Sequence, residues 1–255
     1  MAGHSKWANI KHRKAAQDKK RGKLWSKCSR AIMAAARNGG GDPDTNLALR
    51  YAIDEAKYAN MPKDTIQRAI DKGAGSGGGE NFQEVSYEGY GPAGVAVIVD
   101  GITDNLTRTV GDVRAIFKKA GGSLGQSGSV AFQFETRGRI LIPAAGVTED
   151  ALMEIALEAG AADVAPPEGA TPEEPGFWTV YAEPTAFQRV KDAIDQSPLT
   201  IEEAAIAKIP TNTVEIALED AQKLMNLIDA LEDHDDVQHV YHNADISDEV
   251  AAALA

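Results

Sequence analysis

A glycine-rich run, GAGSGGG over residues 73–79, divides the chain into two parts with different hydrophobic patterns. Glycine is unfavourable inside helices and strands, so this run predicts a flexible linker between domains rather than a packed element. Before it, the apolar residues repeat with the period of a helix, whereas after it short apolar strands alternate with helices. The division predicts an α+β protein with a helical domain at its N-terminal end.

Three helices are expected before the linker. Residues 16–38 contain no proline and many alanines, and a glycine-rich stop follows them. A second helix is expected over residues 44–60. The third begins near Pro62, which suits the first turn of a helix, and Gly73 is expected to end it.

The segments after the linker are expected to form two ferredoxin-like α/β domains, one inserted in the other. Residues 138–210 supply the order strand, helix, strand, strand, helix, strand, which is the ferredoxin-like arrangement. Residues 80–137 and 211–246 each supply half of such a unit, and a half-unit alone leaves an apolar sheet face in water. We therefore expect the two halves to pair. The elements expected in them are strands at 93–99, 130–134, 214–218 and 237–241 and helices at 104–120 and 221–231. The helical domain with its linker is then 1–79, and 247–255 form a tail.

Composition excludes several classes of protein. No apolar run approaches the roughly 18 residues of a membrane helix, and the N-terminus lacks the apolar core of a signal peptide, so we expect a cytoplasmic protein with no membrane partner. Cys28 is the only cysteine, so the chain has neither an internal disulfide nor a CxxC pair.

Charge is distributed very unevenly along the chain. The whole chain has a net charge of −12, yet residues 1–37 hold eleven basic residues against Asp18 alone, a net charge of +10. The remaining 218 residues therefore carry −22. A basic end on an acidic body is typical of polyanion binding, since the acidic remainder repels non-specific contact.

The basic residues of the first helix are expected to form one stripe. Six of them share a narrow sector at 100° per residue, while Leu24, Trp25, Cys28, Ile32 and Ala35 occupy another. The six are Lys19, Lys20, Lys23, Lys27, Arg30 and Arg37. Phosphates would neutralise the repulsion within such a stripe, and Trp7 upstream could stack on a base. The alternative is a solvated helix with a basic tail. We expect that Lys20, Lys23, Lys27 and Arg30 can be changed together to glutamine without loss of folding, and that this change weakens binding. The predicted nucleic-acid-binding residues are Lys6, Trp7, Lys11, His12, Arg13, Lys14, Lys19, Lys20, Lys23, Lys27 and Arg30.

Neither a cofactor nor a metal is expected. Residues 73–78 match GxGxxG, but a helix precedes them and a strand region follows, the reverse of the dinucleotide-binding context. His239 and His242 differ by an odd number and should point to opposite faces of a strand, so they cannot easily share an ion. The neighbouring residues 233–236 are interpreted as a solvated acidic turn. No catalytic residues are identified, although an enzyme acting on nucleotides or nucleic acid is a competing class.

Several motifs resemble those of the YebC family and together span nearly the whole chain. They are MAGHSKW at 1–7, IKHRK at 10–14, MPKD at 61–64, YEGYGP at 87–92, TDN at 103–105, GSVAF at 128–132, and ALED at 230–233 through VYHN at 240–243. The resemblance implies three domains and a probable DNA-binding transcriptional regulator. Related members act on translation, some at ribosomes stalled on proline runs.

We therefore expect a non-enzymatic regulator of gene expression whose basic end binds nucleic acid. The partner is DNA or ribosomal RNA, because lysine and arginine neutralise both phosphate backbones alike. The alternative is a ribosome-associated translation factor. The acidic α/β domains are candidates for contacting the ribosome or another protein, and the loop at residues 90–92 is either a further contact surface or only a turn.

Overall fold

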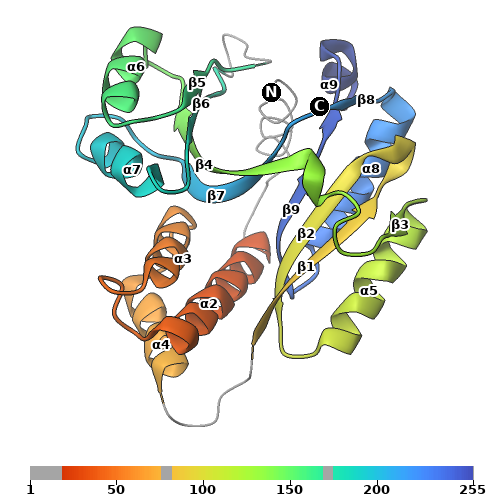
Figure 1. Ribbon diagram of the computed structural model, residues 1–255, viewed down its shortest axis with the longest axis horizontal. Helices are drawn as coiled ribbons and strands as arrows, with labels where there is room; N and C mark the ends of the chain where they lie inside the picture. Colours follow the sequence, from red (N-terminus) through yellow and green to blue (C-terminus); the bar gives the residue numbers. More distant parts are fainter. Residues whose placement is uncertain (1–18, 76–81, 169–174, 255) are drawn as a thin grey trace. The chain divides into compact units, whose positions relative to one another are not determined.

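A computed structural model describes residues 19–75, 82–168 and 175–254, which fall into two compact units (Figure 1). The first unit covers the described residues up to Phe132 together with Glu219–His242. The second covers Gln133–Leu218 and the residues from Asn243 onward. Each unit is described separately below.

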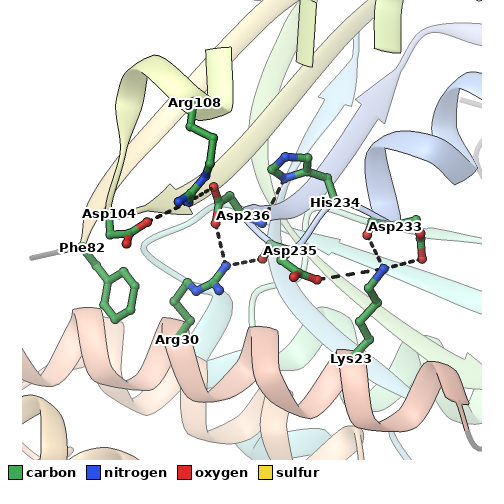
Figure 2. Close-up of a pocket in the computed structure, with 9 residues that line it drawn as sticks. All are labelled: Lys23, Arg30, Phe82, Asp104, Arg108, Asp233, His234, Asp235 and Asp236. Atoms are coloured by element: carbon green, nitrogen blue, oxygen red, sulfur yellow. Dashed lines mark hydrogen bonds and ion pairs between the residues drawn. The ribbon is translucent and has the colours of Figure 1, made fainter. Parts of the chain in front are cut away.

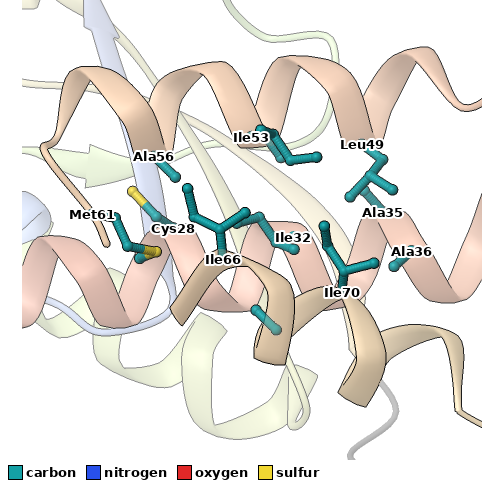
Figure 3. Close-up of a cluster of buried hydrophobic side chains, with 12 residues drawn as sticks. Cys28, Ile32, Ala35, Ala36, Leu49, Ile53, Ala56, Met61, Ile66 and Ile70 are labelled. Atoms are coloured by element: carbon teal, nitrogen blue, oxygen red, sulfur yellow. The ribbon is translucent and has the colours of Figure 1, made fainter. Parts of the chain in front are cut away.

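The first unit begins with three helices, which pack around a common apolar core (Figure 3). They are α2 (Lys19–Gly39), α3 (Leu47–Tyr58) and α4 (Lys63–Ala74). Each contributes apolar side chains three or four residues apart, the spacing that places them on one face of a helix. The buried members are Cys28, Ile32, Ala35, Ala36, Leu49, Ala52, Ile53, Ala56, Met61, Ile66, Ala69 and Ile70. The apolar face predicted for the first helix is therefore confirmed at Cys28 and Ile32, with Trp25 packed against the core, whereas Leu24 is 44% exposed and the prediction is wrong there.

Asn46 fixes the connection between α2 and α3. Its side-chain oxygen accepts a hydrogen bond from the amide of Leu49, which caps the N-terminus of α3. Its amide nitrogen donates to the carbonyls of Ala35 and Gly40, each at 2.8 Å. Since Asn46 is buried, this one side chain satisfies orphan backbone groups at two helix ends.

The remainder of the first unit is a four-stranded sheet of order β3-β1-β2-β9. The strands are β1 (Gln83–Tyr90), β2 (Ala96–Thr103), β3 (Ser123–Leu124) and β9 (Val237–His242). The central strand β2 is buried along almost its whole length, which explains its apolar sequence AVIVDGIT. Its antiparallel pairing with β9 joins segments more than one hundred residues apart in the chain.

Two helices belong to this sheet, α5 (Leu106–Lys119) and α8 (Leu218–Glu232). The ring of Phe117 on α5 lies against Gly89 of β1, where a side chain would not fit. On α8, Leu224 and Leu227 are fully buried and lie against Gly91. The two helices were expected at 104–120 and 221–231, so both predictions are confirmed.

The second unit contains a four-stranded antiparallel sheet of order β5-β6-β4-β7. Its elements are β4 (Phe134–Pro143), α6 (Glu149–Glu158), β5 (Asp163–Ala165), β6 (Phe177–Ala182), α7 (Phe187–Asp195) and β7 (Glu203–Pro210). Phe187 of α7 packs against Gly138 at the centre of β4. The unit ends with β8 (Val214–Glu215), which pairs with β10 (Ala244–Asp245), and with α9 (Asp248–Leu254).

Four predictions about local structure are wrong. The strand expected at 93–99 begins only at Ala96, because η1 (Pro92–Gly94) is a 3-10 turn with positive φ at Ala93. The strand expected at 130–134 is instead the 3-10 turn η2 (Ala131–Gln133), followed by the start of β4. The strand expected at 214–218 is only two residues long, since Leu218 already begins α8. Gly73 does not end its helix, because α4 continues through Ala74.

Gly73 instead allows α4 to approach α2 closely. A Cβ at this position would lie 2.5 Å from the carbonyl oxygen of Met33 and 2.8 Å from its Cα. We predict that Gly73→Ala lowers the free energy of unfolding by about 1–3 kcal/mol, because backbone atoms must move apart. Gly111→Ala in α5 is the matched control, since nothing lies within 4 Å of its Cβ position. That change should leave stability equal or raise it by about 0.5–1 kcal/mol in urea denaturation. Equal stability of both variants would contradict the close approach.

Candidate nucleic-acid interface

The predicted basic residues fall into three groups. Lys19 and Lys20 begin α2. Lys23, Lys27 and Arg30, here called the basic stripe, follow one another along that helix. The other six lie outside the described residues, and they are Lys6, Trp7, Lys11, His12, Arg13 and Lys14.

The basic stripe contacts the connection between α8 and β9, which we call the acidic turn (residues 232–236) (Figure 2). The ammonium group of Lys23 donates to the carbonyl oxygen of Asp233 at 2.5 Å and lies 2.7 Å from its carboxylate. The same group is 4.0 Å from the carboxylate of Asp235. Lys27 donates to the carbonyl oxygen of Glu232 at 2.6 Å. Both lysines therefore meet oxygen acceptors of their own chain.

Arg30 extends these contacts to a buried carboxylate. Its guanidinium donates to the Asp236 carboxylate at 3.0 Å and also to the carbonyl oxygen of Asp235. The ring of Phe82 lies beneath it, 5.6 Å from the guanidinium carbon to the ring centroid, a cation–π distance. Replacing the stripe with glutamine would remove these contacts too. The prediction that folding would be unaffected by that change is therefore not supported by the geometry.

Asp236 is the centre of a buried polar network. Only 2% of the residue is exposed. Its second carboxylate oxygen accepts hydrogen bonds from Arg108 at 2.8 Å, from Thr109 at 2.7 Å and from Thr103 at 3.1 Å. Arg108 also pairs with Asp104 at 2.7 Å. Asp236 thus connects α2, the end of β2 and the first turns of α5.

The pKa of Asp236 is lower than that of an ordinary aspartate. Burial is the largest single effect and opposes ionisation, but the hydrogen bonds from Arg108, Thr109 and Thr103 and the charge of Arg108 together outweigh it. Conversely, the hydrogen bond to Asp236 contributes most to raising the pKa of Arg108. The network is therefore ionic at neutral pH.

A pocket of about 470 Å³ lies between the basic stripe and the acidic turn (Figure 2). Three cationic side chains face it, against four carboxylates, so its formal charge is negative if His234 is neutral. A pocket with this balance does not attract a phosphate group as it stands. Its lining consists of Lys23, Arg30, Phe82, Asp104, Arg108, Asp233, His234, Asp235 and Asp236.

The histidines near this turn have separate surroundings. The amide of Asp236 donates to Nδ1 of His234 at 3.1 Å, and Nε2 of His234 lies 3.3 Å from a carboxylate oxygen of Asp112. His239 of β9 is 3.7 Å from Glu55 of α3, whereas His242 is buried. Among the described residues, no group of three or more His, Cys, Asp or Glu side chains is arranged to hold a metal.

Cys28 is not suited to act as a nucleophile. Burial in the three-helix core, with the nearby charge of Glu55, raises the pKa of its thiol to about 12. The thiol is therefore protonated at neutral pH, and the thiolate is the reactive form. Its role in the described structure is apolar packing.

The acidic turn is where the sequence interpretation was wrong. Asp233 and Asp235 are exposed as expected, but Asp236 is buried and Asp233 pairs with Lys23. Sequence reasoning also missed Arg108, Thr103 and Thr109. Their only sequence signal was the motif TDN at 103–105, whose Asn105 caps α5 by accepting from the amide of Arg108.

The loop at residues 90–92 is a turn that connects β1 and β2. The amide of Gly91 donates to the carbonyl of Val95 at 2.8 Å, and Pro92 is buried. Beside it, the carboxylate of Glu88 accepts three backbone hydrogen bonds from the GSVAF motif, at Gly128, Val130 and Ala131. The GSVAF motif therefore has a structural role, because its backbone is bound by the carboxylate of Glu88.

Two family models together cover almost the whole chain. The model of the TACO1/YebC protein N-terminal domain matches residues 5–76, and that of the TACO1/YebC second and third domain matches residues 82–244. The chain belongs to the TACO1/YebC family. The resemblance noted from the sequence motifs is thus confirmed.

Relatives of similar length occur in diverse bacteria. A protein of Shewanella oneidensis is 55% identical over 254 residues, and one of Rubrobacter xylanophilus is 51% identical over 257; both matches cover 100% of each chain. Each relative is named a probable transcriptional regulatory protein. A solved structure of a conserved hypothetical protein from Aquifex aeolicus shares 48% identity, with a TM-score of 0.84 over 94% of this chain and 97% of that one. In the described part of this TACO1/YebC chain, no helix is both long and apolar enough to cross a membrane.

We predict that Asp236→Asn lowers the free energy of unfolding at pH 7 by about 2–3 kcal/mol, because it leaves Arg30 and Arg108 without their buried counter-charge. Asp235→Asn, at an exposed side chain of the same turn, should change it by less than about 0.5 kcal/mol. Chemical denaturation of the full chain measures both. Similar small losses in the two variants would contradict a central role for Asp236.

The same variant should reveal a pH dependence. Since the folded-state pKa of Asp236 lies below the ordinary 3.8, its stabilising contribution is present above about pH 4. It is lost as the pH falls through the folded-state pKa. The difference in unfolding free energy between the unmodified chain and Asp236→Asn should therefore be largest near pH 7 and shrink towards pH 3. A difference that grows on acidification would contradict the assignment.

Proposed function

We propose that this protein is a non-enzymatic regulator of gene expression that binds nucleic acid, in the manner of a DNA-binding transcriptional regulator, through its basic N-terminal end. The observation that carries the proposal is the net charge of +10 on residues 1–37 against −22 on the rest. Such a concentration attracts a phosphate backbone, while the acidic remainder limits non-specific contact.

The geometry of α2 supports this proposal. One face of the helix is committed to the three-helix core, and the cations of the stripe lie on the opposite side, outside that core, where the acidic turn contacts them. Trp25 stabilises this orientation, since its indole nitrogen donates to the carbonyl of Ala59 at 2.9 Å. The names of the bacterial relatives agree with a role in transcription.

We also propose that residues 138–210 form a ferredoxin-like domain inserted in a second α/β domain, and that the two position the basic end. The second domain was also expected to be ferredoxin-like, but its order β1-β2-α5-β3 followed by α8-β9 differs from that arrangement. The strand order β5-β6-β4-β7, with two intervening helices, agrees with the ferredoxin-like arrangement of residues 138–210. The pairing of β2 with β9 supports one domain built from 80–137 and 211–246, and the family models support a boundary near the linker after 1–79. These acidic surfaces are candidates for contacting a protein partner.

The proposal predicts that Lys6, Lys11, Arg13 and Lys14 changed together to glutamine weaken binding to duplex DNA and reduce its salt dependence. Each lost phosphate contact lowers the slope of log affinity against log salt by about 0.9, so four lower it by up to about 3.6. The measurement is fluorescence anisotropy with labelled 20-base-pair DNA between about 50 and 200 mM salt.

The matched control changes four exposed cations of the first unit to glutamine, Lys63, Arg114, Lys118 and Lys119. It alters the net charge equally and should leave the slope nearly unchanged. Equal losses in the two variants would reject the basic end as the contact. Retention on ribosomes in preference to duplex DNA at matched salt would change the proposed polymer to ribosomal RNA and keep the same surface.

A further inference from the structure

We infer that the acidic turn competes with nucleic acid for the basic stripe, so that the phosphate backbone must displace the turn to contact α2. This inference rests on the proposed function and adds a regulation of the same site. It starts from the observation that Lys23, Lys27 and Arg30 all donate to oxygen atoms of residues 232–236.

The acceptors in the turn resemble those of a phosphate backbone. Carboxylates and backbone carbonyls present closely spaced, partly or fully negative oxygens to the cations, and phosphates present the same chemistry. Phosphate oxygens can therefore replace the oxygens of the acidic turn as acceptors for the basic stripe. The N–H groups of Lys23, Lys27 and Arg30 cannot donate to the acidic turn and to phosphates at the same time.

The closed arrangement disfavours a polyanion. With Asp104, Asp233, Asp235 and Asp236 facing three cations, the pocket between stripe and turn has an excess of negative charge. A phosphate that approached it would meet two exposed carboxylates, those of Asp233 and Asp235. Removal of the turn from the stripe would leave these cations to the incoming phosphates.

The acidic turn contains one residue that is anchored to the sheet and two whose contacts with the stripe can be replaced by phosphates. Asp236 is buried and held by Arg108, Thr103 and Thr109, so it stays anchored to the sheet. The Asp233 and Asp235 side chains are 76% and 69% exposed, and that of Lys23 is 39% exposed. Exposed ion pairs contribute little to stability and are screened by salt, so these contacts can exchange for phosphates while Asp236 keeps its position.

The test compares Asp233→Asn/Asp235→Asn with Glu219→Gln/Asp220→Asn in the full chain. Both double variants remove two negative charges, but the second lies in the first turn of α8, where the charges pair with Lys223 rather than with α2. Anisotropy with labelled 20-base-pair DNA and with a 20-nucleotide RNA measures affinity. We expect the first variant to bind about three- to tenfold more tightly and the second to change by less than about twofold.

Hydrogen exchange of the unmodified chain gives an independent readout. If nucleic acid displaces the exposed part of the turn, amide exchange over residues 232–235 should become faster on binding, whereas exchange in β2 should not. Unchanged affinity of Asp233→Asn/Asp235→Asn, or slower exchange in the turn on binding, would overturn the competition while leaving the proposed function intact. Failure of the unmodified chain and both variants to bind DNA or RNA would instead overturn the proposed function and, with it, this inference.

Discussion

The buried carboxylate of Asp236 is the interaction on which the first unit depends most. It joins Arg30 of the helical segment to Thr103 at the end of β2 and to Arg108 and Thr109 in the first turn of α5. Removing a carboxylate from water is unfavourable unless charged and hydrogen-bonding partners replace the solvent, and here four side chains do so. The basic helix is therefore attached to the sheet of the first unit through an ionic contact.

This arrangement explains how so uneven a charge distribution is compatible with a folded protein. The stripe on α2 would repel itself in isolation, but the acidic turn places carbonyl and carboxylate oxygens against Lys23 and Lys27. The turn and the helix are about two hundred residues apart in sequence. The pairing of β2 with β9 brings them together. The positive charges with which α2 could bind a polyanion thus also make hydrogen bonds and ion pairs within the protein.

Local patterns predicted most of the helices, because apolar periodicity and caps are encoded in neighbouring residues. The core face of α2, the start of α4 after Pro62 and the positions of α5 and α8 follow from such patterns. Residues 130–134 were misread because Val130, Phe132 and Phe134 alternate as they would in a strand, although Phe132 is 75% exposed. The backbone there is instead held in a turn by Glu88, a contact forty or more residues away.

The candidate site was less predictable than the fold for the same reason. A stripe of cations on one helix can be found by its spacing, and the family membership agrees with that interpretation. The burial of Asp236 cannot be found in this way, since it depends on the pairing of distant strands. The role of Gly73 could not be predicted from local sequence either. A glycine that ends a helix and one that lets two helices pack closely look alike in sequence, and only the contact with Met33 of α2 shows that Gly73 is the second kind.

The central claim is that residues 1–37 form the nucleic-acid contact of this family member. The most direct test is ultraviolet crosslinking of the intact protein to nucleic acid, followed by mass spectrometry of the attached peptides. The account predicts crosslinked peptides within residues 1–37, with few or none from the acidic α/β segments. Crosslinks confined to residues 82–254 would contradict it.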